Sequence, residues 1–231
     1  MAINVYWACF ENEWLRATEP IEIKKMHLHT EEFKETGAIR CPATHEFLHN
    51  YYGLKSIYSY DIHVDGDKVW SDQYDQKFFD DHVLIRSKTL KTKCLSFITR
   101  FIYFTDEESL PMSMEQPFLE DNDINDNCIM FPGQFDIAKW FRPTDFAFKL
   151  KRKSNHFSIR ENDIFCYIKF HTKDEIKFTQ FRINKELFDF ASDTTNVSKN
   201  QLNRYHSLES RYKSFSTKKL ILKEIEKNIL T

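Results

Sequence analysis

Glycine is scarce in this sequence, which has only 4 glycines and 6 prolines among 231 residues. No stretch has the glycine spacing of a phosphate-binding loop, so the common nucleotide-binding motifs are excluded. The sequence also has no internal repeat and no low-complexity segment. We therefore expect an ordinary globular chain.

Cysteine is present, but no two cysteines form a CxxC motif. An odd, dispersed set in a chain without a secretory leader predicts buried, reduced thiols and argues against a disulfide framework. The five cysteines are Cys9, Cys41, Cys94, Cys128 and Cys166.

Long apolar runs are missing as well. No segment approaches the roughly 20 apolar residues that a membrane-spanning helix needs. The first twenty residues are acidic and aromatic, without the basic start and apolar centre of a secretory signal. The net charge of -2 offers no whole-chain argument for nucleic acid or an anionic membrane. We expect no membrane partner, and we rank nucleic acid below protein as a partner.

What the sequence has in abundance is aromatic residues, with 22 Phe and 10 Tyr. These residue types favour strands, and 41% hydrophobic residues suffice for a sizeable core. Many short apolar segments and few helical ones predict a mainly β fold, a β-sandwich with the jelly roll as one candidate topology. An acidic loop is expected over 105–128. Strands are expected over 3–10, 20–28, 57–64, 69–70, 94–104, 146–152, 156–163, 164–171 and 176–184.

One short helix is predicted near residues 42–52. Pro42 suits its first turn, and Gly53 suits the position just past its end. Beyond residue 196 the apolar spacing also becomes helical. We therefore divide the chain into a β-sandwich domain, 1–195, and a C-terminal helical appendage, 196–231.

The appendage differs from the rest of the chain in charge. It has 8 basic and 3 acidic residues, so it carries +5 against -7 elsewhere. Its apolar residues need a surface to cover them, because a helix this short is marginal alone. We expect its first half to pack on the β-domain, and the residues after about 217 to be exposed to a partner.

The segment "THEFLH" contains an HExxH pattern, His45-Glu46-Phe47-Leu48-His49. In zinc peptidases two such histidines bind the metal and the glutamate activates its water. A third ligand is missing, because Tyr52 and Lys55 stand where an extended motif needs Gly and a ligand. We predict a polar helix face and no zinc at this motif.

A second metal pattern is His63-Val64-Asp65, which resembles the start of a two-histidine, one-carboxylate iron site. His171 would supply the distal ligand, and Arg182 would hold a 2-oxoglutarate carboxylate. The dipeptide Asp65-Gly66 between alternating runs explains the same residues as a tight hairpin. We prefer the hairpin, with His63 on its first strand.

Two weaker patterns do not predict metal sites. His27 and His29 are expected on one face of a strand, without the glutamate that a cupin site needs. The acidic stretch 121–126 begins like a calcium loop but has Asp126 where glycine is required.

The segment "FPGQFDIAKWFRP", 131–143, concentrates residue types typical of binding hot spots. We name Trp140 and Arg142 as the candidate binding residues. Trp140 is expected to be buried at least in part, and Arg142 to be paired with an acid or exposed near it. The alternative is a core strand with a flanking corner.

Several landmarks of the chain resemble uncharacterised proteins encoded by tailed phages of marine bacteria, and more distantly an uncharacterised bacterial family. They are "RCP", "NYYG", "SIYSYDI" before "DG", "SFITRFIYFTDE", "PGQFDIAKWFRP" and "IRENDIFCYIKFHT", and they span roughly residues 5 to 215. The resemblance implies a compact β-rich domain and carries no known activity.

These observations together predict a non-catalytic, phage-encoded binding or accessory assembly protein. We expect no cofactor and no metal, an unidentified host or viral protein as partner, and a place in the host-cell cytoplasm, with association to the virion as an option. The alternative is a metal-dependent enzyme, either an Fe(II)/2-oxoglutarate oxygenase on a jelly roll or an HExxH-type zinc hydrolase.

Overall fold

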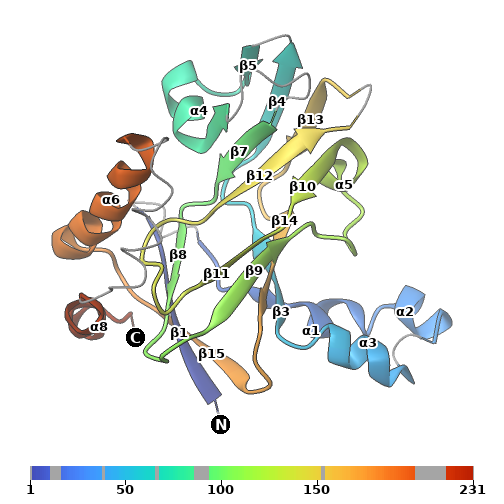
Figure 1. The fold of residues 1–231 in the computed structure, drawn as a ribbon. Coiled ribbons are helices and arrows are strands. Elements are labelled where there is room, and N and C mark those ends of the chain that lie inside the picture. The colour runs from blue at the N-terminus through green and yellow to red at the C-terminus, as the bar shows by residue number, and fades with distance from the viewer. Residues whose placement is uncertain are drawn as a thin grey trace.

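Strands dominate the computed structural model, which describes residues 2–10, 17–37, 40–65, 68–85, 94–151, 154–200 and 217–230, without the side chains of residues 32, 84, 85 and 193–200. The fold is mainly β, as predicted, and its sheets pack in a way compatible with a β-sandwich (Figure 1). The strands are β1 (Ala2–Cys9), β2 (Ile21–Glu22), β3 (Tyr51–Lys55), β4 (Tyr60–Asp65), β5 (Lys68–Trp70), β6 (Val83–Ile85), β7 (Cys94–Ile98), β8 (Phe101–Phe104), β9 (Pro111–Glu115), β10 (Cys128–Phe131), β11 (Gly133–Asp136), β12 (Asp145–Leu150), β13 (His156–Ile159), β14 (Ile164–Phe170) and β15 (Glu175–Gln180).

The described strands form four sheets, with the orders β15-β1-β8, β10-β12-β7-β6, β11-β9-β14-β3-β2 and β13-β4-β5. All pairings are antiparallel except β1 with β15. The helices lie around these sheets, as α1 (Ile23–His27), α2 (Glu31–Glu35), α3 (Pro42–Phe47), α4 (Gln76–His82), α5 (Asp123–Asn127), α6 (Lys185–Asn200) and α8 (Lys218–Lys227).

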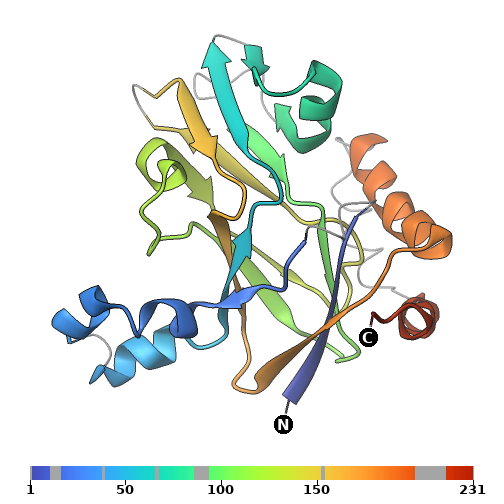
Figure 2. The same cartoon turned by 180° about the vertical axis from the view of Figure 1, so that it is seen from behind.

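Strand β1 is covered on both faces because its two sets of alternating side chains enter different apolar clusters. Val5 and Trp7 lie in the main core between the sheets. Ala8 faces the other way, into a cluster that α6 and α8 complete with Leu187 and Ile225. Figure 2 shows these two helices beside β1, at the flank of the molecule.

The C-terminal region differs from the prediction in two ways. The boundary predicted at residue 196 falls inside α6, which begins at Lys185, where the Asn184 side chain accepts a hydrogen bond from the Leu187 N–H (3.0 Å). The expectation that residues after about 217 are exposed is wrong for one face of α8, because Ile221 and Ile225 are fully buried. Residues 201–216, with the predicted apolar positions Leu202, Tyr205, Leu208 and Tyr212, lie outside the described part.

The strand predicted over 20–28 is also wrong beyond its first residues. Only Ile21–Glu22 pairs with β3, and the chain then turns into α1. Ile23 and Leu28 are both buried in one cluster with Leu48 and Tyr167. On a regular strand these two residues would point to opposite faces of the sheet, because they are five positions apart.

The single strand predicted over 94–104 is two strands in different sheets. The chain breaks at Arg100, whose φ of 63° lies in the left-handed region that few non-glycine residues adopt. Strand β7 therefore pairs with β12 before the break, and β8 pairs with β1 after it.

The helix predicted near 42–52 is present but ends at Phe47. Its predicted terminator, Gly53, lies inside β3 instead, where a Cβ would stand 2.7 Å from the Ile164 side chain. Asn50, with φ 56°, turns the chain from helix to strand. The acidic stretch 105–128 is more ordered than expected, because it contains β9 and α5.

No helix within the described ranges is long and apolar enough to cross a membrane.

Candidate metal centre

Strand β4 sorts its side chains by alternation. Tyr60, Ile62 and Val64 are buried, so Asp61 and His63 point to the outer face of the sheet. The predicted pairing of the two strands is present, with His63 on the first strand opposite Trp70. The turn predicted at Asp65-Gly66 is wrong at its first residue, because Asp65 still belongs to β4 and lies opposite Lys68; residues 66 and 67 lie outside the described part.

Strand β13 brings a second imidazole to the same face. It pairs antiparallel with β4 on the side away from β5, and its first residue, His156, lies directly opposite His63. Directly opposed residues project to the same side of a sheet. Asp61, His63 and His156 therefore meet on one surface, and we call them the outer-face triad.

The outer-face triad has the geometry of a metal-ligand set. One potential ligand atom from each residue lies within 4.8 Å of the other two, and among the described residues no other set of three or more His, Cys, Asp or Glu converges this way. His156 Nε2 contacts Asp61 Oδ1, and His63 Nε2 lies 3.6 Å from Asp61 Oδ2. The side chains are 28%, 34% and 40% exposed for His63, Asp61 and His156, so the site opens to solvent on one side.

The donor set defines the class of ion. Two imidazole nitrogens and one carboxylate oxygen suit zinc and related divalent transition metals. Calcium and magnesium prefer sites built from oxygen atoms.

Neighbouring residues support the strands and rings of the triad. The Trp70 ring stacks on the His63 ring, with 5.3 Å between centroids and 18° between planes. The two triad imidazoles lie 4.6 Å apart, centroid to centroid. On β13, Ser158 donates hydrogen bonds from its N–H (2.7 Å) and its hydroxyl (3.0 Å) to Asp123, which ties the strand to α5.

The HExxH histidines lie elsewhere. His45 is exposed on α3, and His49 Nε2 lies 3.2 Å from the Lys173 carbonyl oxygen. Neither belongs to the triad. The absence of zinc at this motif stays a prediction.

The fold does not bring together the iron ligands considered in the sequence, His63, Asp65 and His171. His171 lies at the end of β14, where its Nε2 is 3.0 Å from Ser113 Oγ. Arg182 follows β15 and donates its backbone N–H to the Asn228 carbonyl (2.9 Å). Asp65 is exposed at the end of β4, and neither it nor His171 is part of the triad.

Two triad members were missed by sequence reasoning. Asp61 had a usable signal, since it precedes His63 by two residues on a predicted strand and therefore shares its face. His156 had none, because its position depends on the pairing of two strands that are 95 residues apart at the Asp61–His156 contact.

The predicted hot-spot pair lies outside this site. Trp140 is half-buried, as expected, and stacks near Phe135 with 4.8 Å between centroids. Arg142 is 9% exposed, with its guanidinium carbon 4.9 Å from the Trp140 ring centre and its Nη2 4.0 Å from Asp145. The expected pairing with an acid is confirmed, and the binding role of the pair stays a prediction.

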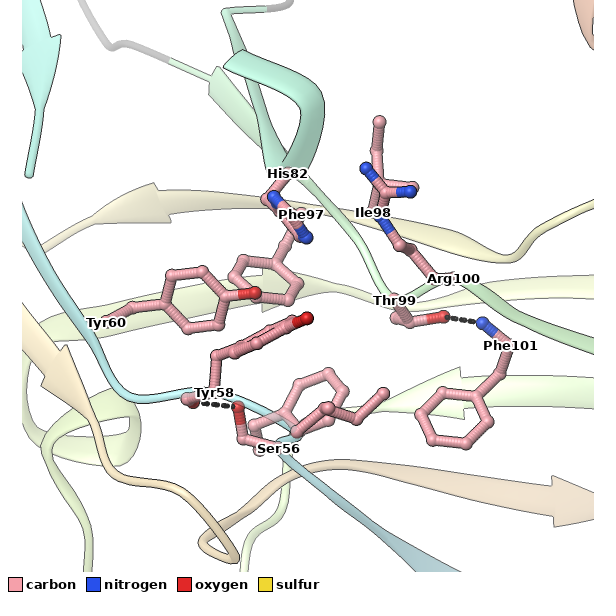
Figure 3. Close-up of a pocket in the computed structure, with 11 residues that line it drawn as sticks. Ser56, Tyr58, Tyr60, His82, Phe97, Ile98, Thr99, Arg100 and Phe101 are labelled. Atoms are coloured by element: carbon pink, nitrogen blue, oxygen red, sulfur yellow. Dashed lines mark hydrogen bonds between the residues drawn. The ribbon is translucent and has the colours of Figure 1, made fainter. Parts of the chain in front are cut away.

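Two cavities among the described residues lie away from the triad. One is a small space of about 10 Å³ beside Tyr58, Tyr60 and His82 (Figure 3), which has room for roughly one water molecule. The other is an open groove of about 650 Å³ between β2 and β15, where Glu22 pairs with Lys25 at 2.8 Å. Neither is lined by a triad residue.

The comparisons with known proteins gave no relative: no family model, curated protein or solved structure matches the chain. The site therefore has to be interpreted from its own chemistry.

Proposed function

We propose that this chain is a non-catalytic binding protein that carries a divalent transition-metal ion on the outer face of the β13-β4-β5 sheet. The proposed ion departs from the expectation of no metal drawn from the sequence, and the observation that supports it is the convergence of Asp61, His63 and His156 within 4.8 Å. The ion would fasten β4 to β13 and give this edge of the molecule a rigid, charged surface. The bound partner would be an unidentified protein.

A binding role is preferred over catalysis because of where the triad lies. It stands on the outer face of a three-stranded sheet, and the described cavities are lined by other residues. Substrate pockets are usually concave and bury most of their ligand. An ion on an open face is better suited to holding a surface in one conformation.

The alternative is a metal-dependent enzyme, and one observation favours it. Two histidines and one carboxylate are also the ligands of Fe(II) oxygenases. The arginine and distal histidine expected for a 2-oxoglutarate enzyme, Arg182 and His171, lie on β15's C-terminal side and at the end of β14, and neither belongs to the outer-face triad. We therefore rank this function second.

The sequence resemblance to phage-encoded proteins supports a further part of the proposal. We propose that the protein acts as an accessory component in an infected host cell, with a host or viral protein as its partner. The landmarks quoted above support this part, and the triad is independent of it.

Zinc titration tests the proposed function. Chelator-stripped wild-type protein should bind one equivalent of Zn²⁺ by isothermal titration calorimetry, and His156→Ala should lose this binding. His45→Ala is the matched control, because it removes an exposed imidazole outside the triad. Wild-type protein that binds no zinc, or His156→Ala that binds as wild type does, contradicts the proposal. Iron-dependent consumption of 2-oxoglutarate by the wild-type protein would favour the enzyme instead.

A further inference from the structure

We infer that Asp72, in the turn between β5 and α4, is the fourth ligand of the metal and completes a two-nitrogen, two-oxygen site with the outer-face triad. The inference rests on the proposed function. It adds a residue that ties a third segment of the chain to the ion.

The distances around His63 carry the inference. Its Nε2 lies 3.6 Å from Asp61 Oδ2 and 3.5 Å from Asp72 Oδ2. Two ligand atoms that each bind a tetrahedral zinc at about 2.0–2.1 Å are about 3.4 Å apart. Both carboxylate oxygens therefore stand at the distance from His63 Nε2 expected for ligands of one shared ion. Asp72 lies outside the set of three that converges within 4.8 Å, so its side chain has to turn toward the ion to complete the site.

These contacts are poor hydrogen bonds. An N–H···O bond has a usual donor–acceptor distance of roughly 2.7–3.2 Å. Consistent with this, His63 Nε2 is screened from solvent and has no hydrogen-bond partner among the described residues. A shielded imidazole nitrogen between two carboxylates is costly without a partner, and a metal ion would satisfy all three groups.

The local fold explains how Asp72 reaches the site. Trp70 lies opposite His63 in the β4–β5 ladder and stacks on its ring. Ser71, the next residue, is buried, and its hydroxyl accepts a hydrogen bond from the Gln73 N–H (3.4 Å). The turn is therefore held beside His63, while the Asp72 side chain remains 73% exposed and free to rotate onto an ion.

A neighbouring carboxylate offers a matched control. Asp65 is also exposed and lies on β4, two residues beyond His63. It has the same charge but lies opposite Lys68 in the β4–β5 ladder, whereas Asp72 Oδ2 lies 3.5 Å from His63 Nε2. Asp65→Asn therefore changes the local charge by the same amount as Asp72→Asn without removing the inferred ligand.

The experiment compares Asp72→Asn, Asp65→Asn and wild type as Co²⁺ and Zn²⁺ complexes. Wild type and Asp65→Asn should show the same visible Co²⁺ spectrum, with the strong absorption of a four-coordinate ion. Asp72→Asn should show a shifted, weaker spectrum and a Zn²⁺ affinity about tenfold lower or more in chelator competition. Asp72 is exposed, so the variant should fold normally, which circular dichroism verifies.

The outcomes separate this inference from the proposed function. If wild type binds one equivalent of metal and Asp72→Asn matches Asp65→Asn in spectrum and affinity, the triad is a metal site and Asp72 is not its ligand. If wild type binds no metal, the proposed function fails, and the inference fails with it. Quenching of Trp70 fluorescence by bound Co²⁺, reduced in Trp70→Phe, reports occupancy beside His63 in each protein.

Discussion

Two regions of the molecule contain the same residue types in different geometry. In the first, His27 Nε2 lies 2.7 Å from Glu120 Oε1, and the Tyr167 hydroxyl donates a 2.5 Å hydrogen bond to the same oxygen. In the second, His63 Nε2 has two carboxylate oxygens at 3.5 and 3.6 Å and no hydrogen-bond partner.

The difference separates a structural cluster from a ligand set. The His27 cluster is largely buried, with side chains 13% and 16% exposed for His27 and Glu120, and it fastens α1 to β14. Its polar atoms satisfy one another, so no ion is needed. At His63 the two carboxylate oxygens lie at distances from Nε2 that are too long for good hydrogen bonds. Figures 1 and 2 show α1 and β4 toward opposite ends of the molecule, so the two clusters can be altered independently.

The largest expected effect is the stabilisation by zinc. A ligand that binds only the folded state at 100 times its Kd adds about 2.7 kcal/mol to the free energy of unfolding. Wild type and His27→Ala should both gain this stability in thermal unfolding with zinc, and His63→Ala should not. A zinc effect that survives in His63→Ala, or that is lost in His27→Ala, would reverse the assignment of the two clusters.

The second effect concerns the structural cluster. Glu120→Ala leaves the His27 ring and the Tyr167 hydroxyl without their shared acceptor, which should cost about 2 kcal/mol in urea unfolding. Glu120→Gln keeps one oxygen acceptor and should cost less. Glu31→Ala is the control, because that side chain is 82% exposed and should change stability by less than about 0.5 kcal/mol. Equal stability of Glu120→Ala and Glu31→Ala would mean that the cluster does not hold α1.

Part of the fold could be predicted from the sequence alone. Alternation predicted β1, the β4–β5 hairpin and the strands after residue 145, because one buried face imposes a period of two. It failed at residues 20–28, where a short apolar run fits both a helix and a strand. It failed again at Arg100, because a left-handed residue without glycine leaves no local signature.

The candidate site was half predictable. Strand alternation alone puts Asp61 on the same face as His63. The observed register puts Trp70 opposite His63, whereas a turn at Asp65-Gly66 would have put Lys68 there. His156 comes from a distant strand, β13, whose register with β4 is set by packing of the whole sheet. Asp123, which ties β13 to α5, also comes from a distant segment. The prediction of Trp140 and Arg142 as binding residues rests on residue type. Residue type does not indicate burial, and the Arg142 side chain is buried.

The third expected effect is a change in stability at a buried polar atom outside the metal site. The Tyr103 hydroxyl also lacks a hydrogen-bond partner among the described residues, but it lies in the apolar core, and burial raises the pKa of this tyrosine. Tyr103 lies near the thiols of Cys9 and Cys166 but belongs to no converging set of three ligand groups among the described residues, so Tyr103→Phe should stabilise the fold by about 1 kcal/mol. Tyr167→Phe, which removes a donor to Glu120, should destabilise it by a similar amount. Destabilisation in both variants, measured by chemical unfolding, would mean that Tyr103 has a partner such as a buried water.

The smallest effect is expected for His156→Ala without metal. Its side chain is 40% exposed, and its contact with Asp61 is partly open to solvent, a type of polar interaction worth about 0–1 kcal/mol. In chelator the variant should therefore unfold within about 0.5 kcal/mol of wild type. In zinc it should lack the whole ligand stabilisation, so that the difference between the two proteins appears only when the ion is added. A large loss in chelator would show instead that the imidazole holds β13 on β4 by itself, and the outer-face triad would then resemble the His27 cluster rather than differ from it.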